Sequence, residues 1–376
     1  MKQIKIYTLL FGLVWALCLS AQEVPTAYRR SSVYSILLKH SEQKFGDAIA
    51  DAFIDMPVPD MFNDHDLSVK VVAVPGKQFV SQELIENFLT KNQVAGRMVA
   101  KWFDWDFLTG QCGLELIKKR GLYDASEVDK ALAAKSFRGS AMLEDAGEEL
   151  ISNTFVLVND IKYNLGSIFN GGLLGGITGM AELRGFKVKI TTYLYQLVWD
   201  EEVAYHFYDN YFTWTPDEVR RDAFKAARNK FKLKYIGCQE SSGKSTSSTG
   251  LGTPHQMLKK ACQRALDENI ASLQTNFEAF QIKVPLLNAK PITAPVGRKE
   301  GITSESEFEV LEKQIDKKGQ TVYKRVGVIT PIEEQIWDNR YMAVEEKAYN
   351  ANLKYTTFKK ESGGKFAPGM LIRQIK

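Results

Sequence analysis

The sequence predicts an α+β protein in which repeated helix–strand units pack helices on a mixed sheet, followed by a small all-β module. Three observations support this fold class. Strand-like and helix-like segments alternate at the start of the chain, a helix-then-strand unit recurs after residue 215, and short strand-like segments prevail from about residue 300. The predicted units are a leader over 1–21, a body over 22–298 and a module of SH3-like barrel type over 299–376.

The first residues have the layout of a secretory signal peptide. Lys2 and Lys5 precede a short apolar run, and small residues end it at Ser20-Ala21-Gln22. We expect cleavage after Ala21, and therefore an exported protein of the periplasm, the outer-membrane surface or the extracellular space. A lipoprotein signal at Cys18 is the alternative, but Leu17 stands where lipoprotein processing requires a small side chain.

Composition is that of an ordinary globular protein, with 44% hydrophobic and 25% charged residues among 376. Loss of the leader removes two of the 49 basic residues and none of the 45 acidic ones, which leaves a formal charge of +2. This near neutrality predicts no nucleic-acid partner. Three cysteines remain, Cys112, Cys238 and Cys262, without CxxC spacing; Cys238 and Cys262 could pair, or all three could be small buried apolar residues.

The first hundred residues are predicted to alternate strands and helices. Strands are expected at 32–38, 67–73 and 97–103, and helices at 45–56 and after the N-cap candidate Ser81. Pro57 ends the first of these helices. Residues 112–151 are predicted to form two or three further helices, with Asp124 and Glu127 as a capping box.

The centre of the chain holds two strand-like runs, 154–158 and 186–199, which flank the apolar glycine-rich loop 163–181. This loop has no charged side chain, and a large exposed apolar patch usually marks an interaction surface. We therefore expect it to contact a membrane surface or a partner subunit, as in a homo-oligomer. The candidate contact residues are Leu173, Leu174 and Ile177. The alternative is a loop that rests on its own domain.

Two helix–strand units follow. Thr215 is the predicted N-cap, and Pro216 the first residue, of a helix that leads to a strand at 231–236. Thr253-Pro254 is predicted to start another helix that leads to an extended run at 280–284. The Ser/Gly-rich segment 239–252 between them is predicted to be a loop too polar for a core. In the C-terminal module, a hairpin is expected over 308–314 and 321–329, with short strands near 336, at 355–358 and at 370–375.

Gly243-Lys244-Ser245 has the composition of a phosphate-binding loop but not its spacing. Gly237 and Gly243 enclose five residues where that loop has four, and a Ser/Thr/Gly run follows instead of a helix. Ser241 and Lys244 also match S-x-x-K, but the companion motifs of penicillin-recognising serine enzymes are missing. We therefore expect no nucleotide, no cofactor and no serine-enzyme activity here.

Two polar clusters have a chemical interpretation and a structural one. Asn63-Asp64-His65-Asp66 could bind a metal, or could be a loop that caps the next strand; the second interpretation is favoured, so no metal is expected. Asp200, Glu201 and Glu202 lie near His206, and two carboxylates can hydrolyse a glycan. The favoured interpretation of that cluster is a solvated hairpin end.

A run of basic residues follows the second cluster, opposed by Asp222. In an exported protein such a surface could bind anionic lipid, a polyanionic glycan or an acidic protein, although a solvated helix face is the favoured interpretation. The run contains Arg220, Arg221, Lys225, Arg228, Lys230, Lys232 and Lys234.

Several segments resemble exported proteins of Bacteroidota with no assigned activity. They are 145–160, 189–200, 325–329 and 336–340, together with the Ser-Ala-Gln end of the leader. The resemblance implies export and supplies no catalytic residues. We therefore expect a non-catalytic cell-envelope protein that acts by binding or assembly, with an envelope protein or the membrane surface as its partner and contact through 163–181. A secreted glycan hydrolase with carboxylates near Asp200 is the alternative.

Overall fold

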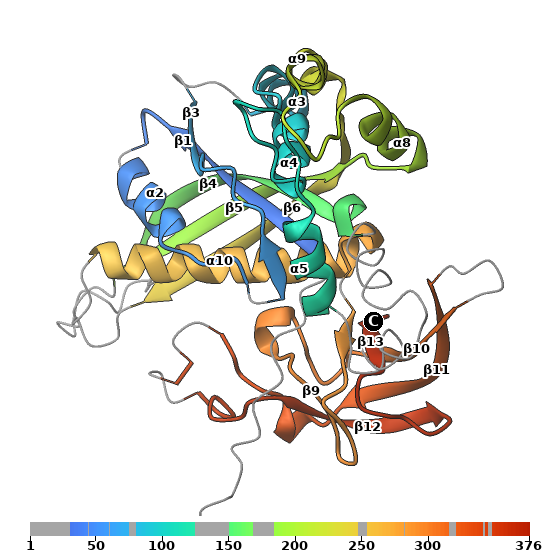
Figure 1. Ribbon diagram of the computed structural model, residues 1–376. Coiled ribbons are helices and arrows are strands. Elements are labelled where there is room, and N and C mark those ends of the chain that lie inside the picture. Colours follow the sequence, from blue (N-terminus) through green and yellow to red (C-terminus); the bar gives the residue numbers. More distant parts are fainter. Residues whose placement is uncertain are drawn as a thin grey trace, which may run out of the picture.

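The computed structural model describes residues 31–43, 45–59, 61–74, 80–124, 150–167, 184–246, 254–281, 283–315, 321–340, 343–344 and 348–376. The predicted leader and the three candidate contact residues Leu173, Leu174 and Ile177 lie outside these ranges. The predicted loop 163–181 is described only over 163–167, where the prediction is wrong because these residues are strand. The described chain confirms the α+β prediction: helices cover a mixed sheet, and a separate curled antiparallel sheet follows (Figure 1).

The first sheet has the strand order β2-β1-β4-β5-β6, with β3 also paired to β1. Its β1 is parallel to β2, β3 and β4, whereas β4, β5 and β6 are joined antiparallel. The strands are β1 (Ser31–His40), β2 (Phe62–Asp64), β3 (Val71–Val74), β4 (Thr154–Ser167), β5 (Arg184–Leu197) and β6 (Leu233–Thr246).

Helices lie on both faces of this sheet (Figure 1). One face packs against α2 (Gly46–Ile54) and the long α10 (Pro254–Asn276). The other face is covered by α3 (Gln82–Lys91), α4 (Val94–Trp102), α8 (Glu201–Asn210) and α9 (Glu218–Ala227), with α5 (Glu115–Asp124) at one end.

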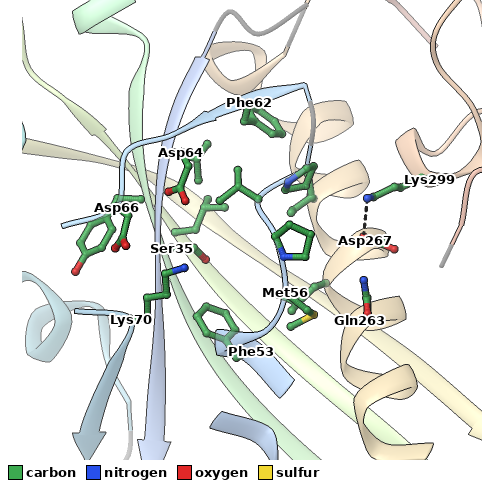
Figure 2. Close-up of a pocket in the computed structure, with 18 residues that line it drawn as sticks. Ser35, Phe53, Met56, Phe62, Asp64, Asp66, Lys70, Gln263, Asp267 and Lys299 are labelled. Carbon is green, nitrogen blue, oxygen red and sulfur yellow. Dashed lines mark ion pairs between the residues drawn. The ribbon is translucent and has the colours of Figure 1, made fainter. Parts of the chain in front are cut away.

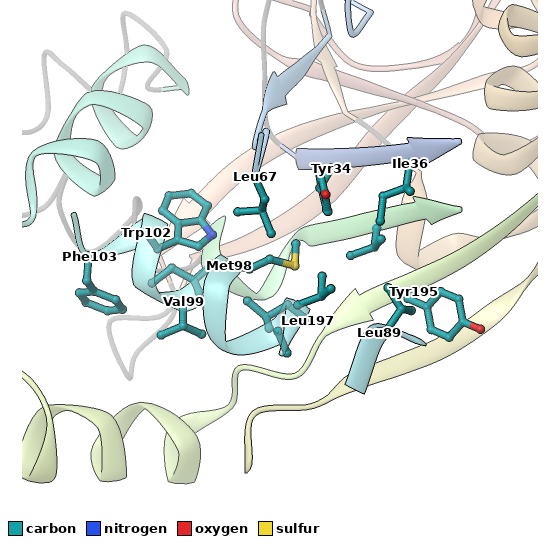
Figure 3. Close-up of a cluster of buried hydrophobic side chains, with 14 of the residues drawn as sticks. Tyr34, Ile36, Leu67, Leu89, Met98, Val99, Trp102, Phe103, Tyr195 and Leu197 are labelled. Atoms are coloured by element: carbon teal, nitrogen blue, oxygen red, sulfur yellow. The ribbon is translucent and has the colours of Figure 1, made fainter. Parts of the chain in front are cut away.

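Alternation along the strands divides the apolar side chains between two cores. Tyr34 and Ile36 point to the α4 side, where Met98 and Trp102 complete the buried cluster (Figure 3). Leu37 points to the opposite side and packs with residues of α2 and α10. Because successive strand residues face opposite ways, the apolar residues of β1 fill both cores.

The second sheet is antiparallel throughout, in the order β7-β13-β10-β11-β12-β9-β8. Register shifts at Val310/Leu311 and Val328/Ile329 bend its strands, and Phe308 packs on Phe358 in its own core. It takes in residues 284–294, ahead of the predicted start at 299. The strands are β7 (Val284–Pro285), β8 (Asn288–Ala289), β9 (Ile292–Ala294), β10 (Phe308–Ile315), β11 (Thr321–Pro331), β12 (Thr356–Gly363) and β13 (Leu371–Gln374).

The strand predicted at 97–103 is wrong: this segment belongs to α4. Met98, Val99 and Trp102 are fully buried, whereas Arg97 and Lys101 reach out to backbone carbonyls. That spacing is typical of an amphipathic helix. In a run this short, periodicity alone does not distinguish a helix from a strand. The predicted N-cap Thr215 is also wrong, because Asp217 caps α9.

The predicted loop 239–252 is wrong over its described part. Residues 239–246 continue β6 and pair with β5 as far as Gly185↔Thr246. Gly243 is buried there against α10, where a Cβ atom would meet the Ala261 carbonyl. β6 is the last strand in the order of this sheet, so the polar composition belongs to a sheet edge. The extended run predicted at 280–284 is shorter than expected, since Glu278–Phe280 is a 3₁₀ turn and β7 begins at Val284.

Candidate ligand-binding site

A gap in the edge of β1 is the starting point of the site. β2 pairs with residues 31–33 and β3 with residues 37–40, so residues 34–36 have no partner strand on this edge. Two hydrogen bonds bound the gap: His65 N–H donates to the Val33 carbonyl at 2.9 Å, and Leu37 N–H donates to the Lys70 carbonyl at 2.8 Å.

The connection between β2 and β3 leaves the sheet edge because its middle is anchored on the other face. Leu67 is buried in the α4-side core, and its carbonyl accepts a hydrogen bond from Arg97 Nη2 at 2.7 Å. The Tyr34 hydroxyl donates to the Val69 carbonyl. These contacts draw residues 66–69 out of line with β1 and thereby open the gap.

Ser35 directs its backbone groups into this gap. Ser32 N–H donates to the Asn153 carbonyl beside β4, and backbone direction alternates along a strand. Val33, Ser35 and Leu37 therefore point their N–H and C=O groups to the opposite edge. Val33 and Leu37 are paired there, whereas no described residue pairs with the Ser35 backbone on that edge.

The Ser35 side chain is held by a buried hydrogen-bond chain. Thr192 Oγ1 donates to Asn159 Oδ1 at 2.7 Å, and Asn159 Nδ2 donates to Ser35 Oγ at 2.9 Å. Because Oγ is the acceptor in this contact, the hydroxyl hydrogen of Ser35 is available for another partner. Ser35 is also the one residue of 31–38 that is not fully buried. Ser35 therefore offers three hydrogen-bonding groups, its N–H, its C=O and its hydroxyl, at a partly exposed position.

An open pocket of about 720 Å³, including its mouth, adjoins Ser35 (Figure 2). It lies between β1, the connection from α2 to β2, and α10. Most of its lining is apolar. The apolar lining side chains are Val33, Phe53, Met56, Pro57, Val58, Pro59, Phe62, Leu157, Leu266 and Ile270.

Polar side chains stand at two ends of the pocket. Asp64, Asp66 and Lys70 line the end beside Ser35, and Asp267 and Lys299 lie across on the α10 side (Figure 2). The Lys299 ammonium is 3.8 Å from the Asp267 carboxylate. Burial raises the pKa of Asp267 to about 6, although Lys299 acts in the opposite direction. An apolar floor with a few fixed polar groups is the usual composition of a small-molecule or peptide site.

The Asn63-Asp64-His65-Asp66 cluster does not converge. Asp64 and Asp66 line the pocket, but the His65 ring is fully buried on the other side of the sheet edge. There His65 Nε2 lies 3.1 Å from the Met98 carbonyl, and Arg120 Nη1 lies 2.9 Å from Nδ1. Burial and the Arg120 charge hold the pKa of His65 well below its usual value. Within the described ranges, no group of three potential ligands is placed to hold a metal ion.

The carboxylates near Asp200 occupy an exposed helix start, so the predicted hairpin end is wrong. Asp200 Oδ1 accepts a hydrogen bond from Val203 N–H at 2.9 Å and so caps α8, while Glu201 and Glu202 are exposed in its first turn. His206 Nε2 lies 2.9 Å from the Tyr211 hydroxyl. None of these residues lines the pocket beside Ser35. The structure does not bring them together as a glycan-hydrolysing site requires.

Three arginines of the basic run make local contacts. Arg220 Nη1 donates to the Phe212 carbonyl at 2.8 Å, and Arg221 Nη1 donates to the Leu108 carbonyl at 2.8 Å. The Arg228 guanidinium lies 4.6 Å from the centre of the Trp105 ring. These residues therefore fasten α9 to its neighbours. Gly243-Lys244-Ser245 lies within β6 and not at a helix N-terminus.

Sequence reasoning missed Ser35, Asn159 and Thr192. A signal existed, since all three are small polar residues within otherwise apolar or β-branched strands. Their meeting depends on the pairing of β1 with β4 and of β4 with β5, which sequence periodicity does not supply.

Among the helices that the structure describes, none is both long and apolar enough to cross a bilayer. No protein-family model and no curated protein matches the chain.

Proposed function

We propose that this chain is an exported, non-catalytic protein of the cell envelope that acts by binding, and that the pocket beside Ser35 is its binding site. The observation that carries the proposal is the combination at this pocket of an apolar lining with the unpaired backbone and hydroxyl groups of Ser35. Export rests on the leader layout at 1–21.

Binding fits the way the polar groups are held. Asn159 and Thr192, on the neighbouring strands, orient the Ser35 hydroxyl through hydrogen bonds, whereas most of the pocket lining around it is apolar. Fixed hydrogen-bonding groups against an apolar wall give orientation and affinity to a ligand without requiring a reaction. The carboxylates of Asp64 and Asp66 add charge selection at one end.

A neutral apolar dye, N-phenyl-1-naphthylamine, tests the pocket. Met56 lines the pocket, so Met56→Trp should fill it and abolish the fluorescence gain of the bound dye. Ile54 ends α2, two residues before Met56, and is 48% exposed, so Ile54→Trp is the matched control that should bind dye like the native chain. Equal dye binding by both variants, at unchanged thermal midpoints, would contradict the proposed site.

Assembly or membrane contact through 163–181 is a second part of the proposal. The segment is uncharged from Tyr163 to Ala181, and Leu173, Leu174 and Ile177 are its aliphatic contact candidates. Replacing these three with serine should move the exported protein from the envelope fraction to the soluble fraction, or reduce its oligomeric mass, with an unchanged thermal midpoint. A lowered midpoint with unchanged fractionation would instead place them in the core. Val219→Ser is the control, because Val219 lies in α9, outside this segment, and is 81% exposed.

The cell fractionation that accompanies this test also examines export. N-terminal sequencing of the envelope-fraction protein should begin at Gln22. A chain that begins at Met1 and stays in the cytoplasmic fraction would contradict the proposed compartment.

The curled second sheet fits the proposed SH3-like barrel in its short antiparallel strands and in the two bulges that bend β11 and β12. Closure of the barrel requires backbone hydrogen bonds between its terminal strands, β7 and β8, which two residues separate in the chain. An experimental structure without such hydrogen bonds would reject the barrel.

A further inference from the structure

We infer that the ligand of this pocket is an extended peptide segment, one residue of which pairs with Ser35 as an added strand while its aliphatic side chain enters the apolar lining. This inference rests on the proposed binding function and specifies the chemistry of the ligand. Its basis is the gap in β1, which presents one residue's N–H and C=O to the pocket side of the sheet edge.

The two free backbone groups match those of a single peptide residue. In a hydrogen-bonded antiparallel pair, two opposed residues exchange both N–H···O bonds, so Ser35 can donate to and accept from the same ligand residue. The Val33 and Leu37 bonds close the gap on both sides. At about 3.3 Å per residue, the three free positions 34–36 span roughly 10 Å, which selects a short segment or a chain end.

The side chains around Ser35 favour a large aliphatic partner. Residues directly opposite in a sheet send their side chains to the same face. The side chain of a residue paired with Ser35 would therefore lie on the α10 face, where Ser35 itself takes up little room. Phe53, Met56 and Leu266 line the space on that face. The Ser35 hydroxyl remains available to a neighbouring carbonyl of the same segment.

Charge at the mouth adds a preference for basic peptides. Asp64 and Asp66 stand at the end beside Ser35, and Lys70 is the single basic residue of the lining there (Figure 2). A peptide with a positive group next to its aliphatic residue would gain an ion pair, whereas an acidic peptide would meet two carboxylates. The partner is thus an extended segment that combines an aliphatic residue with a neighbouring positive charge.

N-acetyl-leucine-N′-methylamide is a minimal probe of this pairing, and its depsipeptide analogue, in which an ester oxygen replaces the leucine N–H, is the matched control. The full exported chain, labelled with ¹⁵N-serine, reports on the site through the Ser35 amide resonance, assigned by its loss in Ser35→Ala. We expect the leucine probe to shift the Ser35 resonance saturably and to leave Ser32, which is buried in β1, unchanged. The depsipeptide should bind about tenfold more weakly because it cannot donate to the Ser35 carbonyl.

The corresponding glycine probe should also bind at least tenfold more weakly, because it lacks the apolar side chain. Two outcomes would overturn the peptide inference and leave pocket binding intact. One is equal binding of the leucine probe and its depsipeptide, and the other is displacement of N-phenyl-1-naphthylamine by the leucine probe without a shift of the Ser35 resonance. Failure of the dye itself to bind the native chain would instead overturn the proposed function. Met56→Trp should abolish the Ser35 shift, and Ile54→Trp should retain it.

Discussion

Gly243 of β6 lies directly against Ala261 of α10. A Cβ atom on Gly243 would stand 2.2 Å from the Ala261 carbonyl oxygen and 2.6 Å from the Ala265 amide nitrogen. Both of those atoms belong to helix backbone, which cannot move aside as a flexible side chain could. The helix therefore crosses the sheet where the strand has no side chain, and this contact explains why one glycine of the Ser/Gly-rich segment is buried.

Gly243→Ala should destabilise the protein by about 3 kcal/mol, because the added methyl group forces α10 away from the sheet. Denaturant unfolding of the two chains measures the difference. Gly364→Ala is the control, since a Cβ at that position meets nothing within 4 Å. A loss no larger than that of the control would mean that α10 does not pack on β6 as described.

Glu300 should make stability depend on pH. Burial raises its pKa to about 7, although its Oε2 accepts hydrogen bonds from Gly297 N–H at 2.6 Å and Asn339 Nδ2 at 2.7 Å. Lys299 lowers this pKa and the Asp267 carboxylate raises it. Because the folded pKa exceeds the unfolded value of 4.5, ionisation favours the unfolded chain, and stability falls as pH rises from about 4.5 to about 7.

Glu300→Gln should flatten this part of the pH profile. Its amide oxygen still accepts from Gly297 and Asn339, but the side chain no longer ionises, so the variant should be more stable than the native chain at pH 8, by at most roughly 3 kcal/mol. At pH 4 the two chains should unfold alike. Thermal unfolding from pH 4 to 8 tests this, with Glu305→Gln at an exposed site as the control. Parallel profiles of Glu300→Gln and the native chain would exclude a raised pKa.

Alkylation should distinguish the three cysteines of the described chain, all of which are free. Cys238 is exposed and pairs with Tyr193 on the α4-side face, whereas Cys262 is fully buried on the α10 side. Burial raises the pKa of Cys262 to about 12 and also raises that of Cys112, which slows both thiols further. Iodoacetamide should therefore label Cys238 alone in the native state, as read by peptide mass spectrometry. A disulfide between Cys238 and Cys262 would contradict their placement on opposite faces.

Capping of α9 gives a direct test of the corrected helix start. Asp217 Oδ1 accepts from Arg220 N–H at 3.0 Å, so Asp217→Ala should cost about 1 kcal/mol. Thr215→Ala, at the exposed position first predicted as the cap, should have little effect. Urea unfolding midpoints compare the two, and a larger loss from Thr215→Ala would restore the original assignment.

The elements that local pattern predicted well are those whose signal lies within one segment. The apolar run at 32–38 became β1, Ser81 caps α3 through the amide of Leu84, and the 308–329 hairpin became β10 and β11. In each case the side-chain period or the capping geometry acts over a few residues, so neighbours in sequence carry the information.

Tertiary contacts decided the rest. Met98 and Trp102 could fill a strand or a helix face, and their burial between the sheet and α3 selects the helix. Residues 239–246 are strand because they pair with β5, and Gly243 lets α10 pack against them.

The sequence by itself determined the α+β class, the starts of α2, α3 and α10 and the C-terminal hairpin, because these follow from local periodicity, caps and turns. It did not determine the candidate site. Ser35, Asn159 and Thr192 come from three strands, and the gap at Ser35 opens because Leu67 and Val69 are held on the other face of the sheet. Strand order and register bring these groups together, and both are set by which apolar faces bury against which helices.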